Sequence, residues 1–223
     1  MTVTIKMCGF RSETDIAHLH DLPVQFAGFI LAPSKRKITI NTLCKLMLRL
    51  PKSVTPVAVM VNPTDEEVEA VIEKAGVTTI QLHGDEAVAW CRSVREKYGS
   101  DIHLIKALPA KGEETLTKIA DYSRVVDTFL IDTYQRDLRG GTGKTFQWEN
   151  IPVYQKACQD AGRPFWVAGG LTPENVQDLL TRYRPDGVDV SSGIERNGVK
   201  AAELMKQFVQ RVRTHDENDR STG

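Results

Sequence analysis

The sequence predicts an α/β protein folded as a single (β/α)8 TIM barrel. Short, β-branched apolar runs alternate with longer amphipathic runs along all of its 223 residues, and eight such pairs can be placed. Strict alternation implies parallel strands joined by helical crossovers, and eight units close a barrel. The alternative is a doubly wound open sheet, which has fewer strands and a G-x-G-x-x-G turn after the first. Here Cys8-Gly9-Phe10-Arg11-Ser12 occupies that turn, which favours the barrel.

Each predicted strand is a short run of apolar, often β-branched residues, as expected for a strand that is buried on both faces. The eight strands are predicted at Val3–Met7, Gln25–Leu31, Pro56–Val61, Thr78–Leu82, Ile102–Ala107, Val126–Asp132, Phe165–Ala168 and Gly187–Val190.

The predicted helices lie between these strands and carry recognisable end signals. Thr172-Pro173 is typical of a helix start, and Gly76 follows a helix as a C-terminal cap does. We expect a barrel domain over 1–213 and a polar, frayed tail over 214–223. The helices are predicted at 13–20, 40–49, 65–75, 86–97, 113–121, 150–161, 174–183 and 200–213.

Composition excludes several classes of partner. Lys plus Arg and Asp plus Glu both number 29, so no basic field attracts nucleic acid or a membrane surface. The first twenty residues carry charge throughout and resemble no signal peptide, so we expect a cytoplasmic protein. The four cysteines form no C-x-x-C pair and no zinc spacing, which predicts free thiols and no metal site. Three of them, Cys44, Cys91 and Cys158, fall within helical patterns and are expected to be buried apolar residues.

Chemistry is expected where the strands end, because the loops after the strands build the active site of such barrels. Lys6 and Cys8 alternate onto the same side of the first strand, towards the barrel interior or its mouth. A lysine there needs a carboxylate partner, and its charge would favour a thiolate at Cys8. The other interpretation of Cys8 is a small buried apolar residue, although its place before Gly9 favours a functional one.

Asp132 ends the sixth predicted strand and is the candidate proton donor. A carboxyl at the lip of an apolar barrel is partly desolvated, which raises its pKa. Cys8 and Asp132 would then flank a substrate as base and acid. A helix cap or a partner for an arginine is the other possibility for Asp132. His83, after the fourth strand, is expected either to donate a hydrogen bond or titrate, or to orient a neighbouring loop.

Three Gly-rich segments follow the last three strands and predict a phosphate site. Glycine allows close backbone approach, and helix N-termini favour anions. For one Gly pair a tight turn is the favoured explanation, but the two loops together, ending in Ser-Ser-Gly, favour a phosphate site. Gly143-Lys144-Thr145 resembles the end of a P-loop, yet Leu138 stands where that motif needs glycine, which excludes it. The predicted phosphate-binding residues are Gly141, Gly169, Gly170, Ser192 and Gly193.

The chain also resembles the phosphoribosylanthranilate isomerase family of tryptophan biosynthesis. The shared motifs occur in family order over nearly the whole chain. They include Lys6-Met7-Cys8-Gly9, Ser34-Lys35-Arg36, Gln81-Leu82-His83-Gly84, Gly140-Gly141-Thr142-Gly143-Lys144, Gly169-Gly170-Leu171-Thr172-Pro173 and Asp189-Val190-Ser191-Ser192-Gly193.

The resemblance implies an Amadori rearrangement of N-(5-phosphoribosyl)anthranilate, without cofactor or metal. It implies that Cys8 is the general base and Asp132 the general acid, and that Arg36 and Asp189 handle the anthranilate end. Lys6 and His83 are expected to join them in substrate binding. Two alternatives remain: the sugar-phosphate isomerase barrel of histidine biosynthesis, which uses aspartates for both proton transfers, and a non-catalytic binder of a phosphorylated ligand. A monomer is expected.

Overall fold

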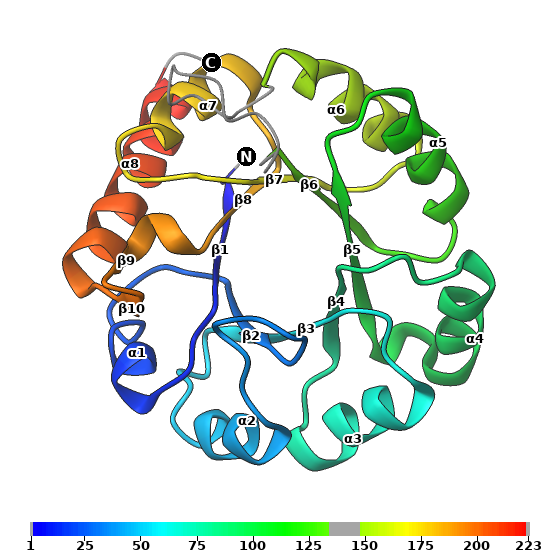
Figure 1. The fold of residues 1–223 in the computed structure, drawn as a ribbon. Coiled ribbons are helices and arrows are strands. Elements are labelled where there is room, and N and C mark those ends of the chain that lie inside the picture. Colours follow the sequence, from blue (N-terminus) through cyan, green and yellow to red (C-terminus); the bar gives the residue numbers. More distant parts are fainter. Residues whose placement is uncertain (1, 134–147, 222–223) are drawn as a thin grey trace.

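The computed structural model describes residues 2–133 and 148–221, and these form a closed barrel (Figure 1). Eight parallel strands pair in chain order, and the last pairs with the first. The predicted fold class is therefore confirmed. The strands are β1 Thr4–Cys8, β2 Phe26–Ile30, β3 Thr55–Met60, β4 Thr79–Leu82, β5 His103–Pro109, β6 Thr128–Asp132, β7 Phe165–Ala168 and β8 Gly187–Val190.

A ring of helices surrounds the barrel, as Figure 1 shows. Among the described residues, no helix is both long and apolar enough to cross a membrane. The helices are α1 Glu13–Ala17, α2 Ile40–Met47, α3 Asp65–Ala75, α4 Val88–Tyr98, α5 Glu113–Tyr122, α6 Ile151–Asp160, α7 Val176–Tyr183 and α8 Ala202–Ser221, with short 3-10 turns η1 Gly99–Asp101, η2 Trp148–Asn150 and η3 Ser192–Ile194.

Helix ends follow local side-chain chemistry in most places. Gly76 ends α3 in the left-handed conformation (φ 65°), as its position after the helix predicted. The start of α7 was predicted wrongly at Thr172-Pro173. The helix begins at Val176, because Thr172 instead accepts a hydrogen bond from the N–H of Glu174 and forms a turn before the helix.

Alternation along the strands divides the barrel residues into two sets. Outward residues such as Ile5, Met7 and Val188 pack against the helices in the larger apolar core. Inward residues fill the barrel itself and form a second, smaller cluster. Its members are Cys8, Val57, Val59, Ile105, Ala107, Leu130, Trp166 and Ala168. Any polar residue at an inward position near the C-terminal end of a strand therefore faces the mouth of the barrel.

The chain end differs from the expected frayed tail. Helix α8 continues past Arg213 to Ser221, so Thr214 to Ser221 extend the last helix of the barrel. Asp216 is 4% exposed, accepts a hydrogen bond from the N–H of Val3 (3.0 Å) and pairs with Arg213 (2.7 Å). The composition of this segment is polar, but one buried carboxylate attaches it to the start of β1.

We expect Asp216→Ala to lower the free energy of unfolding by about 1–3 kcal/mol, because it leaves the buried Val3 N–H without a partner. Chemical denaturation would measure this loss. The exposed neighbour Thr214 offers the control, since Thr214→Ala removes no buried hydrogen bond. Equal stabilities for both variants would mean that the end of α8 contributes nothing.

Candidate active site

Cys8 and Asp132 both face the C-terminal mouth of the barrel. Cys8 is an inward residue of β1, in the same interior cluster as Leu130 of β6. Asp132 follows Leu130 by two residues, so its side chain projects to the same side and lies where the strand ends. The predicted thiol and carboxyl therefore share one compartment, and a ligand in the mouth would lie between strands β1 and β6.

A buried ion pair lies directly beneath Cys8. The Lys6 ammonium is 3.0 Å from Oδ1 of Asp189, and the two residues are register partners in the β1–β8 pair. The predicted carboxylate partner of Lys6 is thus Asp189. Lys6 itself is fully buried, which corrects its placement among the substrate-binding groups. Its side chain has no surface to offer a ligand and acts through its two neighbours.

The environment of Cys8 leaves its thiol harder to ionise than an ordinary cysteine. Burial raises the pKa of Cys8, Lys6 and Lys200 lower it, and Asp189 raises it again. The net pKa lies above the usual value, so the expectation of a partly ionised thiol in the free protein was wrong. The charge of Lys6 acts in the predicted direction, but removal of the sulfur from water outweighs it. Burial lowers the pKa of Lys6, whereas Asp189 and Cys8 raise it by more, so Lys6 stays charged.

His83 lies beside Asp132 at the mouth. Its Nε2 is 3.9 Å from Oδ2 of Asp132, and its Nδ1 is 3.4 Å from the amide nitrogen of Gln81. Burial lowers the pKa of His83 and Asp132 raises it, with a net value below the ordinary one, so the imidazole is neutral at neutral pH. Gln81 was missed from the sequence, although alternation places it inward on β4. Its side-chain oxygen has no partner among the described residues.

A second charged network joins the loops after β2 and β8. Arg36 donates to both carboxylate oxygens of Glu195, from Nε (2.8 Å) and Nη2 (2.7 Å). Lys200 donates to the same carboxylate (2.9 Å) and to the carbonyl oxygens of Cys8 (2.6 Å) and Ser191 (3.0 Å). Burial would raise the pKa of Glu195, but the hydrogen bonds from Arg36 and Lys200 bring it below the usual value.

Glu195 and Lys200 face each other across a small hairpin that the sequence analysis did not predict. Strands β9 Glu195–Arg196 and β10 Val199–Lys200 are antiparallel, and Lys200 pairs with Glu195 in register. Asn197 and Gly198 form the turn with positive φ (52° and 76°). An Asn-Gly pair is a strong hairpin signal, so this element could have been found.

The glycines after β7 and β8 bring two loops together. A Cβ on Gly193 would collide with the carbonyl oxygen of Leu171, so only glycine allows these loops to approach so closely. Gly169 and Gly170 have positive φ (100° and 64°). Among the hydrogen bonds of the described residues, none is donated by the backbone N–H of Gly170 or Gly193. Ser192 begins the adjoining η3 turn, whereas Gly141 lies outside the described residues.

One buried pair stands apart from this mouth. Lys106 is an outward residue of β5, and its ammonium is 2.6 Å from Oε2 of Glu86, both side chains being 1% exposed. The other oxygen of Glu86 accepts the N–H groups of Asn62 and Gly84 (both 2.9 Å). The pair thus fixes the segment that follows His83.

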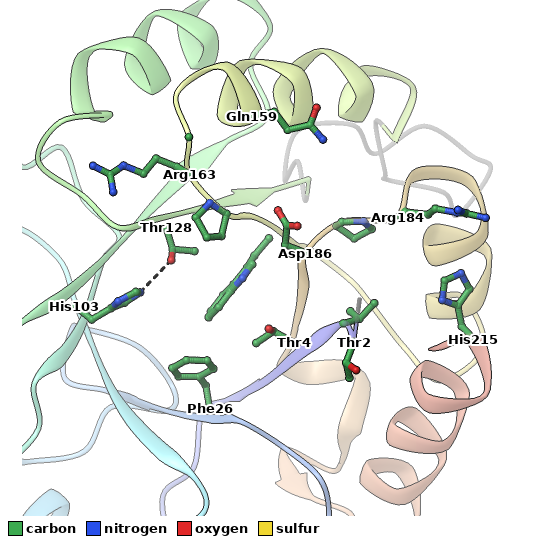
Figure 2. Close-up of a pocket in the computed structure, with 15 residues that line it drawn as sticks. Thr2, Thr4, Phe26, His103, Thr128, Gln159, Arg163, Arg184, Asp186 and His215 are labelled. Atoms are coloured by element: carbon green, nitrogen blue, oxygen red, sulfur yellow. Dashed lines mark hydrogen bonds between the residues drawn. The ribbon is translucent and has the colours of Figure 1, made fainter. Parts of the chain in front are cut away.

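One cavity among the described residues lies at the opposite end of the barrel. It has a volume of about 790 Å3 and lies where strands begin, beside Thr4, Phe26, His103 and Thr128 (Figure 2). Figure 2 also shows the hydrogen bond between His103 and Thr128 (3.0 Å). None of the predicted site residues lines this cavity. Within the described residues, no group of three His, Cys, Asp or Glu side chains is arranged to hold a metal.

Comparison with known proteins identifies the family. The model of the N-(5'-phosphoribosyl)anthranilate isomerase family matches residues 5–211. The chain belongs to this family. An isomerase of that name from Brevibacillus brevis is 41% identical over 215 residues, which cover 96% of this chain and 95% of the relative. One from Rippkaea orientalis is 35% identical over 92% of this chain and 96% of its own length.

Solved structures of phosphoribosylanthranilate isomerases share the fold. The crystal structure of the Thermotoga maritima enzyme has a TM-score of 0.82 at 32% identity, covering 96% of this chain and 100% of that one. A second structure is a complex with reduced 1-(o-carboxyphenylamino)-1-deoxyribulose 5-phosphate, with a TM-score of 0.80 at 30% identity and the same coverage. Family membership agrees with the motifs on which the resemblance rests.

We expect Lys6→Met to shift the alkylation-rate profile of Cys8 to higher pH. Loss of the ammonium removes a charge that lowers the thiol pKa and leaves the Asp189 carboxylate, which raises it. Iodoacetamide modification would be followed against pH in a Cys44→Ser background, because Cys44 is half-buried whereas burial raises the pKa of Cys91 to about 11 and of Cys158 to about 12.

The exposed Lys45 provides the control, since Lys45→Met makes the same change far from the thiol. A Lys6→Met profile that coincides with the parent's would show that Lys6 does not act on Cys8.

Proposed function

We propose that this protein catalyses the Amadori rearrangement of N-(5-phosphoribosyl)anthranilate to 1-(2-carboxyphenylamino)-1-deoxyribulose 5-phosphate, in tryptophan biosynthesis. The observation that carries the proposal is the pair formed by Cys8 and Asp132 at inward positions where β1 and β6 end. An aldose-to-ketose isomerisation moves protons and needs one acid and one base. Family membership supports the substrate.

Asp132 is proposed to act first, as the acid. Its protonated carboxyl gives a proton to the ring oxygen of the ribose, and the C1′–O bond breaks to leave an iminium between C1′ and the anthranilate nitrogen. The neutral His83, 3.9 Å away, adds no positive charge that would favour the ionised carboxylate. This role suits a group that is partly exposed at the mouth, where it can reach a ligand.

Cys8 is proposed to act second, as the base. The thiolate removes the proton from C2′, the iminium accepts the electron pair to give an enolamine, and tautomerisation gives the ketone. The reaction neither gains nor loses atoms. At rest the pair holds one proton, on the thiol, because the pKa of Cys8 is raised. Passage of this proton to the Asp132 carboxylate gives the acid and the thiolate, and after the two transfers the proton is again on Cys8, so the cycle closes. The positive iminium next to C2′ favours the thiolate in the complex. Lys6 and Lys200 add to this effect.

The remaining polar groups divide between the two ends of the substrate. Arg36 and Asp189 are proposed to handle the anthranilate end. The loops after β7 and β8 are proposed to hold the phosphate, as in many barrels of this kind, through Gly169, Gly170, Ser192 and Gly193. Two observations support this assignment: the close approach of the loops at Gly193 and the uncommitted N–H groups. Gly141 is proposed to join them. The reaction as written uses no cofactor and no metal.

Cys8 separates this proposal from the histidine-pathway isomerase, because that enzyme uses a carboxylate as base. A non-catalytic binder of a phosphorylated ligand would explain the glycine loops, but it gives no role to an acid and a base that face one compartment. The monomeric state stays a prediction. The large apolar residues that are exposed, among them Leu48 and Val153, lie on separate elements.

We expect the protein to consume N-(5-phosphoribosyl)anthranilate rapidly and without added metal, because both proton transfers use its own side chains. The substrate forms from anthranilate and ribose 5-phosphate, and loss of its fluorescence measures turnover. A chelator-treated sample serves as control. Binding without loss of fluorescence would support the non-catalytic alternative instead.

We expect Cys8→Ser to lower kcat about 10²- to 10⁴-fold with little change in KM, because a hydroxyl at this position cannot replace the base. Steady-state kinetics would measure both constants. Cys44→Ser makes the same change on helix α2 and is expected to leave both unaltered. Near-normal turnover by Cys8→Ser would remove this residue from the mechanism.

A further inference from the structure

Among the described residues, Arg36 is bound by Glu195 along one edge of its guanidinium group, and the other edge is open. A guanidinium can bind a planar carboxylate in a bidentate manner along either of two edges, Nε with Nη2 or Nη1 with Nη2. Here the first edge is taken by Glu195, with contacts of 2.8 and 2.7 Å. The second edge remains for another planar anion, and its direction is set by the first pair.

The absence of a side chain at Gly9 allows Arg36 to lie over the end of β1. A Cβ on Gly9 would come within 2.6 Å of Cδ and 3.4 Å of Nε of Arg36. Gly9 follows Cys8 directly and has a φ of 92°, a conformation that favours glycine. Arg36 therefore packs over the end of β1, next to the catalytic thiol. Gly9 thus leaves room for the Arg36 side chain, and the Glu195 carboxylate fixes its guanidinium.

Glu195 is in turn held in one position. Its carboxylate side chain is 6% exposed and also accepts a hydrogen bond from Lys200, its cross-strand partner in the hairpin. The Lys200 ammonium has three acceptors, Glu195 and the carbonyl oxygens of Cys8 and Ser191. The Glu195 carboxylate thus pairs with two cations, Arg36 and Lys200. The three side chains together carry a net charge of about +1, which an anionic ligand would neutralise.

We propose that Glu195 is a positioning residue that directs the open edge of Arg36 towards the carboxylate of the anthranilate ring, and thereby selects a substrate that carries this group. The inference rests on the proposed function. It assigns to Glu195 no contact with the ligand, only control over the direction and rigidity of the Arg36 fork. If Glu195 instead served only to stabilise the hairpin, its loss would weaken the binding of both kinds of ligand equally.

A pair of stable ligands distinguishes these roles. Reduced 1-(o-carboxyphenylamino)-1-deoxyribulose 5-phosphate carries the carboxylate, and its aniline counterpart lacks only that group. Calorimetry would measure the dissociation constants of both ligands with the parent protein and with Glu195→Gln, and these four values form a thermodynamic cycle. Because glutamine lacks the charge and one of the two acceptor oxygens, we expect about tenfold weaker binding of the carboxylate ligand and less than twofold weaker binding of the aniline ligand.

Glu203→Gln is the matched control, because Glu203 pairs with Arg196 on the exposed side of the same hairpin (3.2 Å, both side chains more than 60% exposed). It should change neither affinity. In an Arg36→Met background, Glu195→Gln should have no further effect on the preference between the ligands. Equal losses for both ligands, or no loss for either, would overturn the proposal.

Glu195→Asp supplies a second variant if Glu195→Gln does not fold. It keeps the negative charge but shortens the side chain and so shifts the Arg36 fork; a loss confined to the carboxylate ligand supports the proposal, and an equal loss for both ligands contradicts it. Failure of the proposed function would look different. The parent protein would then leave phosphoribosylanthranilate unconverted and would show no preference for the carboxylate ligand.

Discussion

The ion pair between Lys6 and Asp189 is the interaction on which barrel and site both depend. It joins register partners on the first and last strands, where the barrel closes, and it lies inside the barrel beneath Cys8. Two isolated charges in this interior would be costly, whereas a pair with a 3.0 Å contact is tolerated. The two charges of this pair shift the pKa of the Cys8 thiol in opposite directions. Closure of the barrel and the electrostatic environment of Cys8 therefore have one origin.

Much of the fold was predictable because it follows from local patterns. Strands β7 and β8 have the predicted bounds, as does helix α3, where the apolar period and Gly76 agree. Inward alternation also placed Cys8 and Asp132 at one end of the barrel. Errors arose where a distant contact decides a local structure. The end of α8 reads as a polar tail in sequence, yet Asp216 binds a backbone N–H from the other end of the chain.

The charged network at the mouth was harder to predict. The hairpin that pairs Glu195 with Lys200 could have been predicted from its Asn197-Gly198 turn. The contact between Glu195 and Arg36 could not, because these two residues are 159 positions apart. The direction of the pKa shift of Cys8 could not be predicted, because burial raises this pKa while the nearby lysines lower it. Burial of the sulfur is a property of the folded barrel and leaves no local mark in the sequence.

The hydrogen bond from Val3 to Asp216 spans 213 positions, and the Lys6–Asp189 contact spans 183. Loop-closure entropy opposes such remote contacts until the intervening elements have formed. Completion of the ring is therefore a late step as the polypeptide folds. During synthesis on the ribosome, the edge of β1 that pairs with β8 remains unpaired until β8 has emerged. Aggregation through that edge is the hazard that this order of events creates.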